Sequence, residues 1–424
     1  MMDADKALEL VKSGATLLLL DVPQYTLIGI DTQVFSVGPA FKGIKMIPPG
    51  VHFVFYSSST RDGKEFSPIT GFFIDAGYSQ VVVRMWDQQE ERLIKVPEEE
   101  EERYRQAVRS FEFDKHLGPY DISLYADWKR LSNYITKSNI ERLEPIGGEI
   151  TVTYEHGMLK NTCKSAMERV LDEQLRNSKF SSPAEKHPKR GCYYTPIPRI
   201  IKRKGIESEQ LTSLNLDKAS TELLETLLVK DYGGFEESLL GELQFAFIAF
   251  LMGQSLEAFM QWKSLVSLLL GCTEADKLID PPSAIVSGDI PNKKETHYWP
   301  FQTRSQLFTK FIKVIYYQLK YGLQKDRCVG EAGTSALLDD SWFSSDSFLH
   351  RLCKDFFSLV QDASVVDGDL LSWTRKLKEL LENSLGWEFQ QKSAVDGIYF
   401  EENDEYAPVV EMLDELSGSE PTSS

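Results

Sequence analysis

The chain has 424 residues, 42% of them hydrophobic and 26% charged, and its 64 acidic residues outnumber 47 lysines and arginines to give a net charge of −17. A chain of this length ordinarily forms more than one core, so two domains are expected. Broad contact with nucleic-acid phosphates requires Lys and Arg. The acidic balance therefore favours protein partners, and we do not expect direct nucleic-acid binding.

The first part of the chain is predicted to be rich in β-strands. A short helix at Ala4–Lys12 precedes runs of β-branched and aromatic residues separated by Gly, Pro, Asp and Ser, which is typical of a small, mainly antiparallel β domain. The predicted strands are Thr16–Leu20, Val51–Tyr56, Gly71–Ile74 and Val81–Trp86. Two helical patterns follow, one starting with Glu98–Glu102 and one at Asp121–Lys137, and we expect both to pack on this domain.

The stretch Gly43–Gly50, GIKMIPPG, stands out within this β-rich part. Pro48 and Pro49 stiffen the backbone, and Gly50 permits a tight turn. One interpretation is a rigid connection between strands. The other is a preorganised loop that presents Lys42, Lys45 and Met46, with Pro48 and Pro49, to a partner. The residues leave both open.

A basic, proline-rich segment interrupts the chain near residues 186–204 and marks a domain boundary. It is interpreted as a solvated linker, as a nuclear import signal, or as an RNA contact in which Tyr193 and Tyr194 stack on bases. The predicted organisation is α+β. It comprises an N-terminal, mainly β domain with packed helices (1–182), the linker (183–206), a C-terminal all-α domain (207–399) and an acidic tail (400–424).

The most apolar run, Gly241–Leu270, is too often interrupted by polar residues to span a membrane and predicts two buried helices. Gly253 is expected to end the first in a left-handed conformation, and Ser255 to cap the second. Gly322 and Gly386 are expected to stop later helices. The apolar stripes expected along this domain are Phe247, Phe250 and Leu251; Phe259, Trp262, Val266 and Leu269; Leu307, Phe311, Ile315 and Leu319; Phe348, Leu352, Phe356 and Leu359; and Leu370, Leu377, Leu380 and Leu381.

The acidic tail has no Lys or Arg after Phe400 and contains one apolar island, Tyr406–Leu413. Val409 and Val410, with Tyr406 and Pro408 beside them, could extend the edge of a partner's sheet or dock back on the chain's own helical domain. Polar stretches earlier in the chain hold Ser283, Ser287 and Ser345, which are candidate phosphorylation sites.

The sequence contains none of the common catalytic or cofactor signatures. It has no phosphate-binding Gly-rich loop, no Gly-x-Ser-x-Gly and no His-Glu-x-x-His. His350 and Cys353 lie one helical turn apart but have no second ligand pair, so a zinc site is not expected. The five cysteines are scattered without a Cys-x-x-Cys pair, which fits a reducing compartment. We expect no cofactor, metal or catalytic residue.

Four blocks, in order, resemble the a1-alpha2-repression splicing-factor family. They are VGPAFKGIKMIPPGVHFVFYS (37–57), LGPYDISLYADWKRLSNYIT (117–136), the Gly241–Leu270 run and APVV (407–410). The resemblance implies a non-enzymatic chaperone of U5 snRNP and tri-snRNP assembly for the spliceosome, found in cytoplasm and nucleus. Its expected partner is the large U5 scaffold protein, through that protein's RNase H-like and Jab1/MPN-type domains, in competition with the U5 helicase.

Overall fold

The computed structural model describes residues 4–60, 65–154, 191–198, 213–272, 276–277, 297–298, 304–323, 347–362 and 366–389. Met1–Trp387 form one compact unit, and Glu388–Ser424 form a second. The helices and strands described below all belong to the first unit. In it, a β-rich N-terminal part and a helical C-terminal part confirm the predicted α+β class. The predicted domain boundaries stay predictions.

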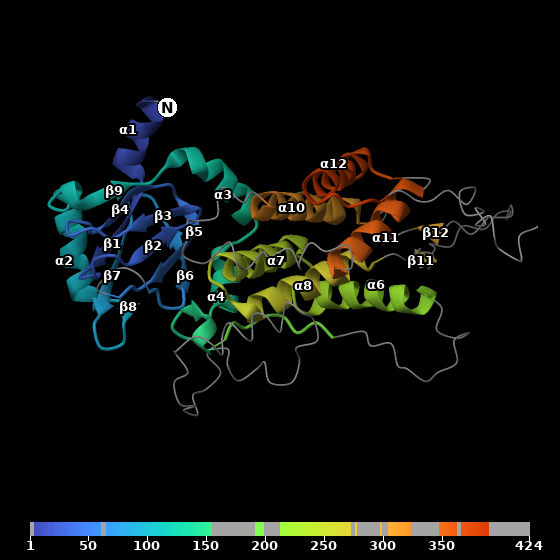
Figure 1. The fold of residues 1–424 in the computed structure, drawn as a ribbon, viewed down its shortest axis with the longest axis horizontal. Coiled ribbons are helices and arrows are strands. Elements are labelled where there is room, and N and C mark those ends of the chain that lie inside the picture. Colours follow the sequence, from blue (N-terminus) through green and yellow to red (C-terminus); the bar gives the residue numbers. More distant parts are fainter. Residues whose placement is uncertain are drawn as a thin grey trace, which may run out of the picture. The chain divides into compact units, whose positions relative to one another are not determined.

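Two five-stranded sheets form the β-rich part (Figure 1). The first has the order β8-β7-β1-β4-β9, with parallel pairs β1–β7 and β4–β9, and the second, β10-β6-β5-β2-β3, is antiparallel throughout. The strands of the first sheet are β1 (Ala15–Leu20), β4 (Gly43–Ile47), β7 (Val81–Asp87), β8 (Arg92–Ile94) and β9 (Leu117–Pro119). Those of the second are β2 (Leu27–Ile30), β3 (Gln33–Ser36), β5 (Gly50–Ser57), β6 (Thr70–Ala76) and β10 (Ile150–Thr151). All four predicted strands are confirmed.

Strand β1 explains how the layers stack, because its side chains alternate between two cores. Leu17 and Leu19 belong to the core shared by both sheets, which includes Ile28 and Val54 of the second sheet. Leu18 and Leu20 belong to a second cluster, where Tyr104 and Val108 of helix α2 (Glu98–Arg109) cover them. The predicted helix after Pro97 is thus confirmed, and β1 is a run of leucines from Leu17 to Leu20 because both of its faces are buried there.

The helical pattern predicted at Asp121–Lys137 forms two helices, α3 (Tyr125–Ser132) and α4 (Lys137–Leu143). Thr136 ends the continuity, because its hydroxyl accepts from Asn139 N while the Asn139 side chain accepts from Thr136 N. This capping box starts a new helix at Lys137. The N-terminal helix α1 (Ala4–Ser13) is confirmed, and three short 3-10 turns lie at Asp114–His116, Ile122–Leu124 and Val152–Tyr154.

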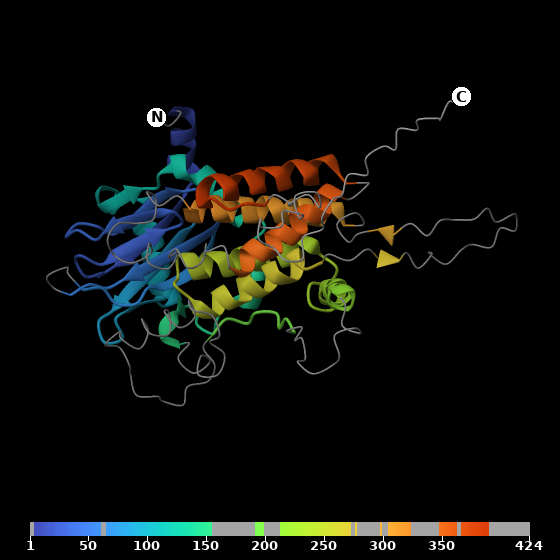
Figure 2. The ribbon, with the colours of Figure 1, turned by 45° about the vertical axis from the view of Figure 1, so that its right-hand side comes forward.

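The C-terminal part is a helical assembly (Figure 2). Helices α7 and α8 form the predicted hairpin, and α10 lies beside α12. The helices are α6 (Ser213–Lys230), α7 (Glu236–Leu251), α8 (Leu256–Leu270), α10 (Ser305–Leu323), α11 (Phe348–Asp362) and α12 (Gly368–Leu385). A two-residue antiparallel pair joins β11 (Asp276–Lys277) to β12 (His297–Tyr298). No helix in the described ranges is long and apolar enough to cross a membrane.

The predicted stripes of α7, α8 and α10 are buried, and Ser255 caps α8 by accepting from Ala258 N. The prediction for Gly253 is wrong: Gln254 takes the left-handed conformation, with φ of 54°, whereas Gly386 does end α12 with φ of 65°. The α11 stripe is also misplaced. Its buried residues are Leu349, Cys353, Phe356, Phe357 and Val360, so only Phe356 of the predicted four is buried. Cys353 holds a position that was not counted as apolar, although free Cys packs like a small hydrophobe.

Gly241 marks a close approach between α7 and the α3–α4 corner. A Cβ there would lie 2.6 Å from both Tyr134 O and Asn139 Oδ1. We predict that Gly241→Ala lowers the free energy of unfolding by about 1–3 kcal/mol, because overpacking outweighs the better helix propensity of Ala. Urea denaturation measures it. Gly368→Ala is the matched control, since nothing lies within 4 Å of its added Cβ, and equal stability of the two variants would contradict the prediction.

Candidate functional site

Most of the GIKMIPPG stretch is strand, since Gly43–Ile47 forms β4 and only Pro48 and Pro49 connect it to β5. Both interpretations placed the whole stretch between strands and are therefore wrong about Gly43–Ile47, whereas Pro48 and Pro49 do connect two strands. Lys42 Nζ lies 3.9 Å from Asp21 Oδ1, and Lys45 Nζ lies 2.6 Å from Asp114 Oδ1. Both lysines thus have carboxylate partners within the fold.

The other members of this predicted contact set are less accessible than a loop would make them. Met46 is half-buried, with φ of 63°, and Pro48 is buried. Pro49 is half-buried, and its carbonyl accepts from Tyr125 Oη at 3.2 Å. The helix that follows the β domain therefore holds the proline connection in place. Partner contact by Lys42, Lys45, Met46, Pro48 and Pro49 stays a prediction.

A buried polar cluster supports the same connection from below. His52 Nδ1 lies 2.7 Å from Asp31 Oδ2, and His52 Nε2 lies 2.6 Å from Pro48 O. Tyr120 Oη donates to Asp31 Oδ2 at 2.6 Å, and Phe53 N donates to Asp31 Oδ1 at 3.0 Å. Both ring nitrogens of His52 face groups that only accept, so both carry protons and the ring is an imidazolium paired with a carboxylate.

Burial lowers the pKa of His52, but the charge of Asp31 and the hydrogen bonds to Asp31 and Pro48 outweigh it, so the pKa is raised. Burial and the same carboxylate raise the pKa of Tyr120. The Asp31, His52 and Tyr120 side chains resemble an acid–base relay in composition, yet none is more than 1% exposed. We assign them to holding the Pro48 connection and the turn at Asp31, which has φ of 55°.

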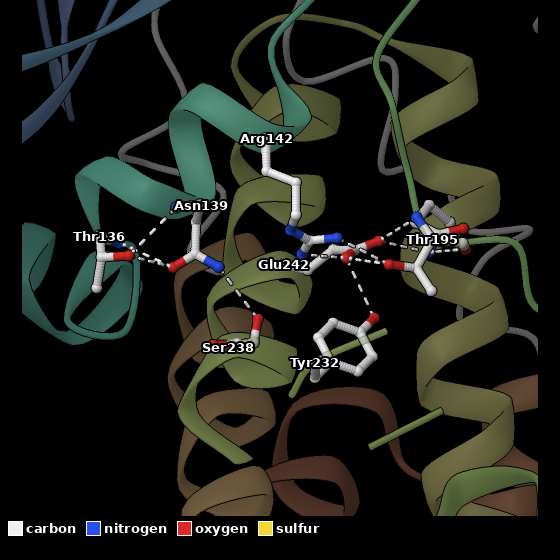
Figure 3. Close-up of polar contacts among 8 residues, drawn as sticks. Thr136, Asn139, Arg142, Thr195, Tyr232, Ser238 and Glu242 are labelled. Atoms are coloured by element: carbon white, nitrogen blue, oxygen red, sulfur yellow. Dashed lines mark hydrogen bonds and ion pairs between the residues drawn. The ribbon is translucent and has the colours of Figure 1, made fainter. Parts of the chain in front are cut away.

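A second polar network centres on Glu242, a fully buried carboxylate in α7 (Figure 3). Arg142 of α4 donates to it at 2.7 Å, Thr195 N and Oγ1 each donate at 2.8 Å, Gln261 of α8 at 2.8 Å and Tyr232 Oη at 3.1 Å. Burial and the neighbouring carboxylate raise the pKa of Tyr232, which keeps its hydroxyl protonated as a donor. The network joins α7 to α4, to Thr195, to Tyr232 in the turn before α7 and to α8.

Further polar groups fasten α7 to the α3–α4 corner. Gln244 Oε1 accepts from Tyr134 N at 2.8 Å, while its Nε2 donates to Asn133 Oδ1 at 2.9 Å. Asn139 Nδ2 donates to Ser238 O at 3.2 Å (Figure 3). Gln244 thereby supplies partners to backbone and side-chain groups at the end of α3, where helical hydrogen bonds run out.

Aromatic contacts join the second sheet to the helices beside these polar groups. The rings of Phe73 in β6 and Phe245 in α7 stack with centroids 4.4 Å apart, and Tyr194 packs edge-on against Phe245 at 6.0 Å. Tyr194 is therefore held against the core, whereas Tyr193 is 50% exposed. Of the two tyrosines predicted to stack on RNA bases, Tyr193 is the more accessible, and Tyr194 is half-buried.

Several predicted site residues lie outside the described residues. These are the tail residues Tyr406, Pro408, Val409 and Val410 and the candidate phosphorylation sites Ser283, Ser287 and Ser345. The sequence interpretation missed Asp31, His52, Tyr120 and Glu242. Glu242 had a usable signal, because a carboxylate inside the most apolar helix must find donors when it is buried. The described residues hold no group of three His, Cys, Asp or Glu that could bind a metal.

The chain is thus an α+β protein. Two packed β-sheets make up its first part, and buried polar contacts hold that part against the helices of the second. Residues 13–145 match the AAR2 N-terminal domain, and residues 194–390 match the AAR2 C-terminal repeat region. The chain belongs to the AAR2 family, as the four sequence blocks predicted.

Two of the similar proteins span most of the chain, and a third spans less of it. Protein AAR2 homolog of Homo sapiens is 29% identical over 98% of this chain and 97% of its own length, and that of Caenorhabditis elegans is 29% identical over 89% and 95%. A1 cistron-splicing factor AAR2 of Saccharomyces cerevisiae is 22% identical over 61% of this chain and 71% of its own. The likeness thus extends over both parts of the fold.

The Glu242 network predicts a large effect of a small change. Glu242→Gln removes the charge and directs an amide NH₂ at donors, and we expect it to lower the free energy of unfolding by on the order of 3 kcal/mol, since hydrogen bonds to charged groups contribute about 1.5–3 kcal/mol each. Urea denaturation measures it. Glu141→Gln is the control, because that side chain is 64% exposed on α4. A loss no greater than the control's would contradict the role given to Glu242.

The His52 cluster predicts a dependence of stability on pH. The pKa of His52 in the folded protein lies above its unfolded value of about 6.5. The His52–Asp31 pair therefore contributes stability that is fully present below a pH of about 6.5, and this contribution is lost as the pH rises through the raised pKa. The stability difference between wild type and His52→Gln should therefore shrink as pH rises. Ring titration by NMR is the direct check: Tyr120→Phe should keep a raised pKa, Asp31→Asn should lower it, and a wild-type ring titrating below its ordinary value would refute the assignment.

Proposed function

We propose that this chain is a non-enzymatic assembly chaperone in pre-mRNA splicing. It binds the large U5 snRNP scaffold protein during U5 snRNP biogenesis, through the RNase H-like and Jab1/MPN-type domains of that protein, and blocks premature binding of the U5 helicase. It works in tri-snRNP assembly and is found in cytoplasm and nucleus. The absence of enzymatic activity is part of the proposal.

The observation that carries the proposal is family membership over both parts of the fold, with a yeast relative named as an A1 cistron-splicing factor. The fold adds a physical reason. A sandwich and a helical assembly joined through Glu242 and Gln244 form one body within Met1–Trp387. A body of this kind can present two surfaces in a fixed relation, so two domains of one partner bind with high effective concentration.

The alternative of an RNA-binding module that uses the basic linker has less support. Tyr194 is half-buried and packs on Phe245, so Tyr193 is the more accessible of the two proposed stacking rings. The chain has a net charge of −17, so the surface away from the basic linker would repel an RNA strand. Salt-sensitive binding of isolated U5 RNA remains the observation that would favour it.

We expect the full chain to co-elute with the purified RNase H-like and Jab1/MPN-type domains in size-exclusion chromatography with light scattering. A chain ending at Glu402 should bind more weakly, because it lacks the apolar island with Val409 and Val410. Added helicase should be displaced or excluded by the full chain. No complex at micromolar concentrations would refute the proposed function.

The same co-elution measurement tests the predicted partner contact by the lysines in and beside β4. Lys42→Gln with Lys45→Gln should weaken scaffold binding if these lysines touch the partner, whereas Lys137→Gln, on the exposed face of α4, should not. Thermal unfolding must accompany the test, because Lys45 is paired with Asp114. Equal binding by all variants, with the truncation also silent, would move the interface to other surfaces of the folded body.

A further inference from the structure

Three aromatic rings gather on the side of the helical part where α10 meets α12. Tyr316 and Tyr317 of α10 lie edge-on to each other at 5.3 Å, and both contact Trp373 of α12, at 5.6 and 5.9 Å. All three are half-buried, and α10 and α12 lie side by side in both ribbon views (Figures 1 and 2). A cluster of three large rings at a surface is a feature more typical of interfaces than of solvated faces.

Lysine ammonium groups stand over these rings. Lys376 Nζ lies 4.3 Å and Lys313 Nζ 5.3 Å from the Trp373 centroid, and Lys320 Nζ lies 5.8 Å from that of Tyr316. Each distance fits a cation held by the negative ring face. We call Lys313, Tyr316, Tyr317, Lys320, Trp373 and Lys376 the lysine–aromatic surface. Arg130 of α3 extends it by lying 5.3 Å from the Tyr317 centroid.

These three lysines differ from others in the part of the chain that the structure describes, because they have no carboxylate partner there. Among the described residues, no carboxylate lies within ion-pair distance of Lys313, Lys320 or Lys376. By contrast, Lys310, one turn from Lys313 on α10, pairs with Glu237, and Lys45 pairs with Asp114. In a chain with 64 acidic residues, lysines that rest on rings rather than on acids keep a local positive charge available.

We propose that the lysine–aromatic surface is a docking site for an acidic peptide segment of a partner protein. Its carboxylates would pair with Lys313, Lys320 and Lys376, and its apolar atoms would lie on the exposed parts of Tyr316, Tyr317 and Trp373. The charge complementarity is local, because aromatic partners fix the positions of these cations, and no carboxylate of the described residues must first be displaced. This surface is distinct from β4 and does not depend on the identity of the U5 partner.

Two observations favour a peptide over a nucleic acid. The Trp373 ring already carries two ammonium groups, so its faces are poorly placed to stack on bases, which is the main sequence-tolerant contact of single strands. The patch is also short: Lys313 and Lys320 are seven residues apart on α10, or roughly 10 Å at the rise of a helix. A nucleic-acid strand would extend past it over a protein of net charge −17.

The test measures binding of a fluorescein-labelled octaglutamate peptide to the full chain by fluorescence anisotropy at low and at physiological salt. Replacing Lys313, Lys320 and Lys376 together by Gln should weaken binding by about tenfold to thirtyfold, since each exposed ion pair changes affinity by about twofold to threefold. The matched control replaces Lys95, Lys115 and Lys137 by Gln. These lysines are exposed in the N-terminal part, and replacing them removes the same total charge. Circular dichroism and thermal unfolding check that both variants fold.

Full affinity in the lysine–aromatic variant, or an equal loss in the control, would overturn the proposal, because the effect would then come from net charge alone. No measurable peptide binding by the wild type would overturn it as well. Labelled oligouridylate is tested in parallel. Tighter binding of that probe than of the peptide, lost in the same variant, would replace the peptide by RNA. Failure here leaves scaffold co-elution untouched, so the two proposals are separable.

Discussion

The structure depends on a carboxylate that has no access to water. Glu242 lies in α7, the most apolar of the described helices, and placing a charge there is costly unless several donors surround it. The donors come from α4, from Thr195, from the turn before α7 and from α8. Since each donor lies on a different segment, the charge is compensated only when all of them are in place. Folding of the helical part is thereby coupled to the end of the β-rich part.

Apolar contacts alone would not specify this arrangement as closely. Phe73 against Phe245 buries area without fixing one orientation, because ring contacts tolerate small shifts. Gln244 and Asn139 add directional bonds to particular backbone groups of the α3–α4 corner and of α7. Gly241 allows the helix to approach that corner at a distance that a methyl group would prevent. Buried apolar area and directional hydrogen bonds together fix the position of α7 against the α3–α4 corner.

The elements that the sequence predicted well were those with a strong local pattern. The strand Val51–Tyr56 and the α7–α8 hairpin have apolar residues at a clear period, and Ser255 and Gly386 mark helix ends by their own chemistry. β4 was missed because GIKMI carries a lysine and is followed by two prolines, so it read as a connection. The α11 stripe was shifted because Cys353 and Phe357 were left out of the apolar count.

The polar networks were beyond local patterns for a different reason. Asp31, His52 and Tyr120 are brought together by the pairing of β2 with β5 and by the return of the chain after β9, so nothing in their sequence spacing connects them. Glu242 and Arg142 are likewise 100 residues apart in the chain. Charge placement obeys the same logic at the surface. A lysine such as Lys45, which is paired with Asp114, has its charge compensated within the fold. A lysine such as Lys376, which lies over the Trp373 ring, has a charge that a carboxylate of a partner can still pair with. An acidic chain can therefore offer cationic contacts where aromatic residues, rather than acids, line a helix face.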